Sequence, residues 1–146
     1  MILLLELLDE AYNKKSWHGP NLRGSLRGVT AKEAAWRPAS GRHNIWEIAV
    51  HAAYWKYVVR RRLRGDRRGS FPLKGSNWFD RPISLTEKAW RLDVALLEQE
   101  HGKLRQAVAS FPLKPGDMAL VQGIAFHDVY HAGQIQLLKR LQTTRL

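Results

Sequence analysis

Cysteine is absent from the 146 residues of this sequence. A disulfide scaffold, a thiolate metal site and a cysteine nucleophile are therefore excluded. If the chemistry of this protein uses a thiol, the thiol must arrive with a cosubstrate.

The sequence also lacks a hydrophobic run long enough to cross a membrane. Its most apolar stretch, "MILLLELLDE" at residues 1–10, is interrupted by Glu6 and Asp9, and no basic region precedes it. A membrane-spanning helix needs about 20 apolar residues, and a signal peptide begins with a basic segment. We therefore expect a cytoplasmic protein without a membrane partner.

Negative charge is scarce, because 13 Asp and Glu residues face 24 Lys and Arg residues, for a net charge of +11. Such a balance attracts phosphates, nucleic acid or acidic small molecules without identifying which one is bound. Hydrophobic residues make up 45% and charged residues 25%, which is typical of a globular chain. With no repeat or long linker, the length predicts a single domain over residues 1–146.

Helical patterns and their boundary signals cover most of the chain. The main helical segments are expected at residues 2–15, 45–64, 84–110 and 117–142. Pro20 is expected to open a short helical piece near residues 20–28, and capping boxes are expected at Thr30–Glu33, Asn44–Glu47 and Ser84–Glu87. Gly65 should end the second long helix. Amphipathic helices without a convincing strand predict an all-α fold, a four-helix bundle.

Three histidines lie on the helix stripes that should face the core. On the last helix the stripe is Leu120, Ile124, His127, His131, Ile135 and Leu138; on the second it is Ile45, Ile48, His51, Trp55 and Val58. Two histidines four residues apart present two nitrogens to one ion, and a third from a facing helix leaves coordination positions open. The alternative is three core histidines, each of which would need its own partner to offset desolvation.

Other polar residues on these helices are weaker candidates. Glu47, one turn before His51, could orient a ligand or relay a proton, although its capping role explains it equally well. Gln134 could hydrogen-bond His131, and Trp55 could contact a substrate. Asp128 follows His127 directly and should point about 100° away, so we do not expect it to be a ligand.

The other three histidines are expected to be surface or capping residues. His18 lies in the "WHGP" break and His43 precedes a helix cap, where either could line the mouth of a pocket. His101 is expected on the polar side of its helix.

Three segments, "WHGPNLRGSL", "HNIWEIAVHAAYWKYVVRRRL" and "FHDVYHAGQIQLLKR", together resemble the DinB-like superfamily, particularly its YfiT-like metal-dependent hydrolases. The similarity runs from about Leu7 to Leu141. The resemblance implies a four-helix bundle in which His51, His127 and His131 hold a divalent nickel, zinc or iron ion. It also implies a small-molecule substrate and a homodimer. Relatives include bacillithiol transferases and mycothiol-dependent maleylpyruvate isomerases, which use a low-molecular-weight thiol.

Three functions remain open at this point, and the first is a metalloenzyme of the hydrolase or thiol-transferase type. The second is a bundle that binds metal without catalysis, or a dimerisation module with tryptophans as interface anchors. The third is a nucleic-acid-binding bundle that uses the arginine-rich run at residues 60–68. A solvated helix end explains that run as well, and no nucleic-acid motif accompanies it. We therefore favour the metalloenzyme.

Overall fold

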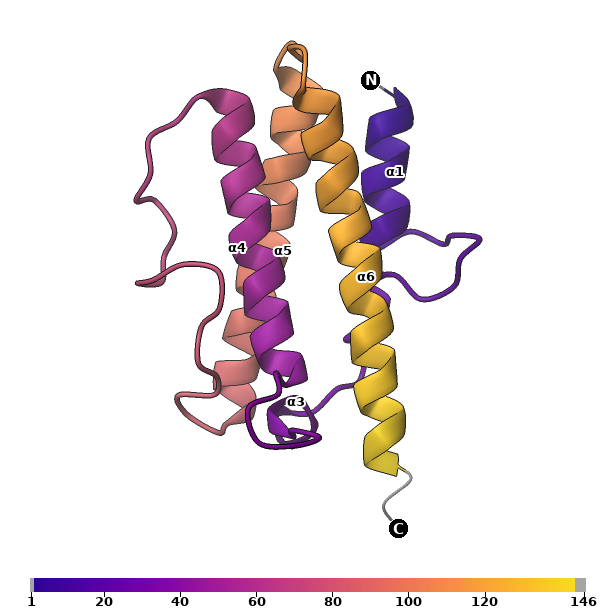
Figure 1. Ribbon diagram of the computed structural model, residues 1–146, viewed down its shortest axis with the longest axis vertical. Helices are drawn as coiled ribbons and strands as arrows, with labels where there is room; N and C mark the ends of the chain where they lie inside the picture. Colours follow the sequence, from indigo (N-terminus) through magenta and orange to yellow (C-terminus); the bar gives the residue numbers. More distant parts are fainter. Residues whose placement is uncertain (1, 144–146) are drawn as a thin grey trace.

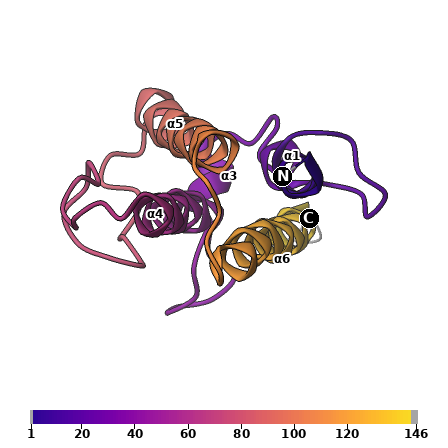
Figure 2. The same cartoon turned by 90° about the horizontal axis from the view of Figure 1, so that it is seen from above.

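The computed structural model describes residues 2–143 and contains helices but no strand within that range. The helices are α1 (Ile2–Tyr12), α2 (Leu22–Ser25), α3 (Ala31–Ala35), α4 (Ile45–Arg64), α5 (Glu87–Ser110) and α6 (Asp117–Thr143). Seen from above, the four long helices follow one another around the core in the order α4, α5, α1, α6 (Figure 2). The predicted all-α four-helix bundle is confirmed. No helix in the described range combines the length and the apolar character that crossing a membrane requires.

The long helices run in two directions. Helices α4 and α5 are parallel to each other and antiparallel to α1 and α6 (Figure 1). A parallel pair needs a return connection, and residues 66–86 supply it by running back along the outer side of α4 (Figure 1). The connection from α5 to α6 spans only residues 111–116. It crosses the end of the bundle, because α5 and α6 are antiparallel and lie diagonally opposite each other (Figure 2).

Local capping explains where the helices begin and end. The predicted capping boxes of Thr30 with Glu33 and of Asn44 with Glu47 are both formed. Gly65 ends α4 in the left-handed conformation at φ 73°, which glycine adopts without steric cost. The predicted bounds of α4 are therefore confirmed.

Two predicted helix starts are wrong. Thr86, not Ser84, is the N-cap of α5, and its hydroxyl oxygen accepts the Ala89 N–H. The Glu87 carboxylate instead accepts the Ala31 N–H at 2.8 Å, so it caps the start of α3 through a tertiary contact. Asn21 caps α2, which places Pro20 outside that helix rather than at its first position.

The core consists of two apolar clusters separated along the helices by polar residues. One cluster includes Trp46, Leu97 and Ile135. The other includes Leu8, Leu104 and Ile124. Each fully buried side chain of this kind stabilises the fold by about 2 kcal/mol. Between the clusters, buried polar side chains come from three helices: Lys56 from α4, Glu100 and His101 from α5, Asp128 and His131 from α6.

Candidate metal centre

Three imidazoles from two helices meet between α4 and α6. The Nε2 atom of His127 lies 3.1 Å from Nε2 of His51 and 3.0 Å from Nε2 of His131. One ligand atom from each ring lies within 4.8 Å of the other two. Two nitrogens bound to one zinc ion at 2.0–2.1 Å are separated by about 2.9 to 3.4 Å for angles between 90° and 109°. The measured separations therefore fit atoms that share one ion.

We call these three residues the histidine centre. His127 and His131 lie on one face of α6, because residues four apart on a helix are neighbours. His51 faces them from α4, with which α6 is packed. His51 and His131 are buried, and His127 is partly exposed. Within residues 2–143, this is the one group of three or more potential metal-ligating side chains that converge in this way, and Asp128 is not part of it.

The outer nitrogens of two rings are held by acceptors. Nδ1 of His51 lies 2.9 Å from the carbonyl oxygen of Asn77, and Nδ1 of His131 lies 2.7 Å from Oε1 of Gln134. Since an oxygen of this kind only accepts, each Nδ1 carries the proton and each Nε2 keeps its lone pair. Two lone pairs are thus directed at His127, whose single Nε2 proton could satisfy one of them at most. A cation would satisfy all three nitrogens.

Burial keeps these histidines neutral. It lowers the pKa of His51 from 6.5 to about 4 and that of His127 to about 3, and it lowers the pKa of His131 as well. Repulsion from a protonated His131 would lower the pKa of both His51 and His127 further, and His43 adds to this effect at His51. At His127, His51 and the ammonium group of Lys56 add to it. Neutral imidazole is the form that binds metal ions.

The segment that returns along α4 supplies two residues that the sequence did not assign to the metal site, although Trp78 is one of the tryptophans considered as interface anchors. Trp78 stacks on His51 at 3.8 Å and 7° and also stacks on His43 at 3.5 Å and 5°. Asn77 has φ 65°, a left-handed conformation that asparagine tolerates better than most residues. Its backbone oxygen accepts from His51, and its side-chain oxygen accepts the indole N–H of Trp55 at 2.8 Å. These contacts fix the orientation of His51.

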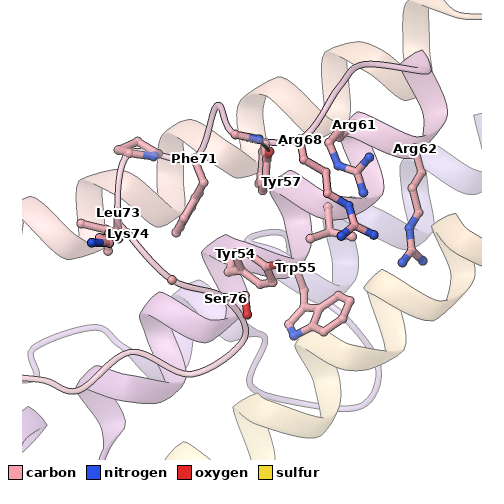
Figure 3. A pocket seen from close by; sticks show the side chains of 14 residues that line it. Tyr54, Trp55, Tyr57, Arg61, Arg62, Arg68, Phe71, Leu73, Lys74 and Ser76 are labelled. Atoms are coloured by element: carbon pink, nitrogen blue, oxygen red, sulfur yellow. Dashed lines mark hydrogen bonds between the residues drawn. The ribbon is translucent and has the colours of Figure 1, made fainter.

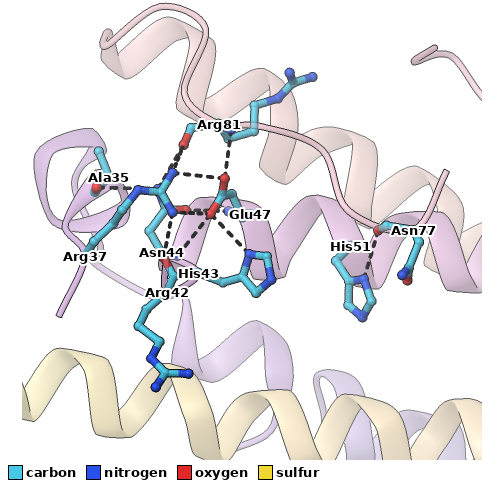
Figure 4. Close-up of polar contacts among 9 residues, drawn as sticks. All are labelled: Ala35, Arg37, Arg42, His43, Asn44, Glu47, His51, Asn77 and Arg81. Atoms are coloured by element: carbon cyan, nitrogen blue, oxygen red, sulfur yellow. Dashed lines mark hydrogen bonds and ion pairs between the residues drawn. The ribbon is translucent and has the colours of Figure 1, made fainter. Parts of the chain in front are cut away.

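Glu47 is engaged elsewhere. Its carboxylate accepts hydrogen bonds from the guanidinium of Arg37 at 2.5 and 3.0 Å and from the backbone N–H groups of Asn44 and Arg81. Burial alone would raise the pKa of Glu47, but these hydrogen bonds outweigh burial and lower it. Figure 4 shows the carboxylate directed at Arg37, whereas the His51 ring points toward Asn77. Glu47 is therefore an ionised structural carboxylate at the start of α4.

A cavity of about 470 Å³ opens directly beside the histidine centre. Its polar lining comes from His131, Gln134, His43 and Arg42, and the rest is mostly apolar. The apolar lining includes Ile48, Trp78, Leu137 and Leu138. The volume lies in the range of small-molecule sites. A ligand in this cavity, called here the apolar pocket, would touch His131.

His101 was expected on a polar surface, and this prediction is wrong. The side chain is buried against α1, where it stacks on Tyr12 at 3.7 Å and 20°. Neither ring nitrogen has a hydrogen-bond partner in the described part of the chain. His18 does lie on an exposed turn, beside Ser16, and lines neither of the pockets described here.

Replacing His101 with leucine should therefore make the free energy of unfolding less dependent on pH below pH 6. Burial lowers the pKa of His101 from 6.5 to about 3, so the unfolded chain takes up the proton first as the pH falls. Because of this residue alone, the free energy of unfolding of the wild type falls by about 1.4 kcal/mol for each pH unit between pH 6 and 4. The His101→Leu variant does not show this contribution. Urea unfolding followed by circular dichroism measures the difference.

At pH 7 we expect His101→Leu to be at least as stable as the wild type, because it removes two buried polar atoms without partners. The exposed His18→Leu variant serves as the control for loss of an imidazole. If the free energy of unfolding changes with pH in the same way for the wild type and for His101→Leu, the predicted role of His101 is wrong.

Comparison of the sequence with models of known protein families gave a match. The family model described as the DinB superfamily matches residues 16–135, a range that includes His51, His127 and His131. The comparisons with curated proteins and with solved structures found no match.

Proposed function

The chain belongs to the DinB superfamily, and from that premise we propose that it is a divalent-metal-dependent enzyme acting on a small molecule. In this proposal His51, His127 and His131 hold a nickel, zinc or iron ion. The observation that carries the proposal is the convergence of three Nε2 atoms beside the apolar pocket.

When bound, a divalent ion supplies Lewis acidity, which polarises a carbonyl or lowers the pKa of a water or thiol that coordinates it. The protein's own residues prepare the site for this chemistry. Three neutral imidazoles leave the charge of the ion intact, and Asn77 and Gln134 hold two of the rings in the required tautomer. Three protein ligands leave coordination positions for a substrate, as catalytic sites require.

The reaction would be of the hydrolase or the thiol-transferase type. In a transferase the thiol would belong to a low-molecular-weight cosubstrate, because the chain has no cysteine. Trp78 and the leucines of the apolar pocket would receive an apolar part of the substrate and exclude bulk water from it. His43 and Gln134 line the same pocket and could bind polar groups of the substrate.

Cobalt(II) substitution tests whether the centre is open. We expect the visible absorption bands of the cobalt protein to change when a small thiol or a hydroxamate is added, because each would enter a free coordination position. A response to the thiol favours transfer, and a response to the hydroxamate alone favours hydrolysis. If neither ligand changes the spectrum of a fully loaded protein, the site is closed and the non-catalytic metal-binding bundle is the better description.

We further propose that residues 1–146 form one domain and that the protein is a cytoplasmic homodimer. The outer face of α6 supports the dimer, since exposed apolar side chains recur there at helical spacing: Phe126, Tyr130, Leu137 and Leu141. Sedimentation of the purified protein tests the dimer, with Phe126→Lys for comparison, because Phe126 is exposed and does not line the apolar pocket.

A further inference from the structure

A second cavity lies between the C-terminal half of α4 and the segment that returns along it, and Trp55 separates this cavity from His51. Its volume is about 640 Å³, which is again the size of a small-molecule site. Figure 3 shows Arg61, Arg62 and Arg68 extending toward one side of it, above Trp55, with Lys74 at the opposite end. We call this cavity the basic pocket.

The cations of the basic pocket have no carboxylate partner in residues 2–143. Arg61 donates only to the backbone oxygen of Asp66, at 3.4 Å. The carboxylate of Asp66, which lies just beyond the end of α4, forms its ion pair with Arg64 instead. No acidic side chain lines the cavity. The pocket therefore concentrates positive charge that the protein itself does not neutralise.

The favourable interaction of cations with the C-terminal end of a helix explains only part of this cluster of positive charge. Cations in the last turn of a helix complement its dipole, and that accounts for Arg61 and Arg62. It does not account for Arg68 and Lys74, which come from the returning segment and line the same cavity. Cations from two separate parts of the chain, α4 and the returning segment, thus line one open cavity.

The wall of the basic pocket is fixed rather than loose. The hydroxyl oxygen of Tyr57 accepts the backbone N–H groups of Gly69 and Ser70 at 3.0 and 3.3 Å. Phe71 stacks on Tyr57 at 5.4 Å and 28°. These contacts hold the returning segment over α4 and keep the space between them open.

Trp55 and Asn77 connect the basic pocket with the histidine centre. Trp55 lines the pocket, and its indole N–H donates to the side chain of Asn77, whose backbone oxygen accepts from His51. The indole also lies edge-on to the His51 ring, with centroids 6.4 Å apart. A molecule bound in the basic pocket would therefore lie one side chain away from a proposed metal ligand.

We propose that the basic pocket binds the phosphate or carboxylate groups of a small molecule whose other end reaches the histidine centre. Binding in the pocket stands on its own, and only the reach to the centre rests on the proposed function. Arginine forks bind both kinds of anion through paired hydrogen bonds. With the apolar pocket beside His131, the centre would have separate sites for an apolar group and for an anionic one.

Calorimetric titration with two probes, pyrophosphate and citrate, tests the pocket and identifies the kind of anion. The test variant is Arg62→Gln with Arg68→Gln, and both residues are exposed and form no ion pair with a carboxylate in the described part of the chain. Each lost charge-assisted contact should weaken binding about tenfold, so the pair should weaken it about 100-fold. The control is Arg27→Gln with Arg67→Gln, which makes the same change of charge at exposed positions outside the pocket. The control should alter the affinity by less than about threefold.

Equal weakening by both double variants would show a general effect of net charge and overturn the proposal. So would the absence of binding by both probes at low salt. If a single-stranded oligonucleotide binds in a pocket-dependent way while neither probe does, the surface is a nucleic-acid interface instead. The titrations are repeated with His127→Ala, which removes a proposed metal ligand that contacts His51 and His131 and does not line the basic pocket. Anion binding that survives in a variant without metal would leave this pocket established even where the proposed enzyme is not.

Discussion

Replacing His51 with alanine is expected to weaken metal binding by more than about 100-fold. Loss of a group that merely supports a ligand costs 10 to about 100-fold in metal affinity, and the loss of a ligand itself should exceed that. The same result is expected for His131→Ala, since each ring supplies one of three converging nitrogens. Elemental analysis after dialysis, followed by titration against a chelator of known affinity, measures the change.

Two variants set the scale for this experiment. Gln134→Ala should weaken binding by 10 to about 100-fold, because it removes the acceptor for Nδ1 of His131 and leaves the ligand in place. His18→Ala removes an exposed imidazole outside the centre and should leave the affinity unchanged. Wild-type metal content in both His51→Ala and His131→Ala would falsify the proposed three-histidine site.

Metal binding should also appear as thermal stabilisation. At a free metal concentration 100 times the dissociation constant, the folded state gains about 2.7 kcal/mol, provided that the unfolded chain does not bind the ion. For a chain of this length, that corresponds to roughly 8 °C in melting temperature. The gain should be absent in His51→Ala, so a melting curve with and without metal gives an independent measurement.

The fold could be predicted because its main signals are local. The boxes at Thr30 and Asn44 and the left-handed Gly65 act within a few residues, and the apolar stripes have the period of a helix. The histidine stripe was visible for the same reason, since His127 and His131 share a face whatever surrounds them. What they face, by contrast, depends on how the helices pack.

Two of the errors came from contacts between segments distant in the sequence. His101 lies on the polar side of α5 by composition, yet α1 covers it with the ring of Tyr12. Glu87 reads as part of a local capping box, yet its carboxylate caps another helix. Periodicity along one helix cannot say which neighbour covers a given side chain.

Residues that support the histidine centre were missed for a related reason. Asn77 and Trp78 belong to a segment without regular structure, so no periodic pattern marks them. They reach His51 only because α4 and α5 are parallel and the chain must return along α4 (Figure 1). The glycine and polar residues around position 77 predicted a loop correctly, but they did not indicate which residues the loop would contact.

A second large effect is expected at Lys56 and Asp128, which form an ion pair between α4 and α6 with both side chains fully buried. Burial lowers the pKa of Lys56 and raises that of Asp128 to about 6, so the environment opposes charge on each. Asp128→Asn or Lys56→Met alone should destabilise the protein by about 3 to 5 kcal/mol, because one buried group is left without its partner. Urea unfolding at pH 7 measures this loss.

The same substitution at an exposed pair provides the control. Asp66→Asn breaks the ion pair with Arg64 at the surface and should change the stability by less than about 1 kcal/mol. A loss at Asp128→Asn as small as that at Asp66→Asn would mean that the buried pair is not electrostatically coupled.

The double variant Lys56→Met with Asp128→Leu separates stability from positioning. Apolar replacement of a whole buried pair is often neutral or stabilising, so we expect it to recover most of the 3 to about 5 kcal/mol lost by the single variants. Metal affinity should not recover with it, because Lys56 follows His51 by five residues and Asp128 follows His127 directly. The pair therefore ties α4 to α6 within about one and a half turns of the histidines, and Met and Leu can pack at several registers. Wild-type metal affinity in a fully stable double variant would show that apolar packing alone holds His51 opposite His127 and His131.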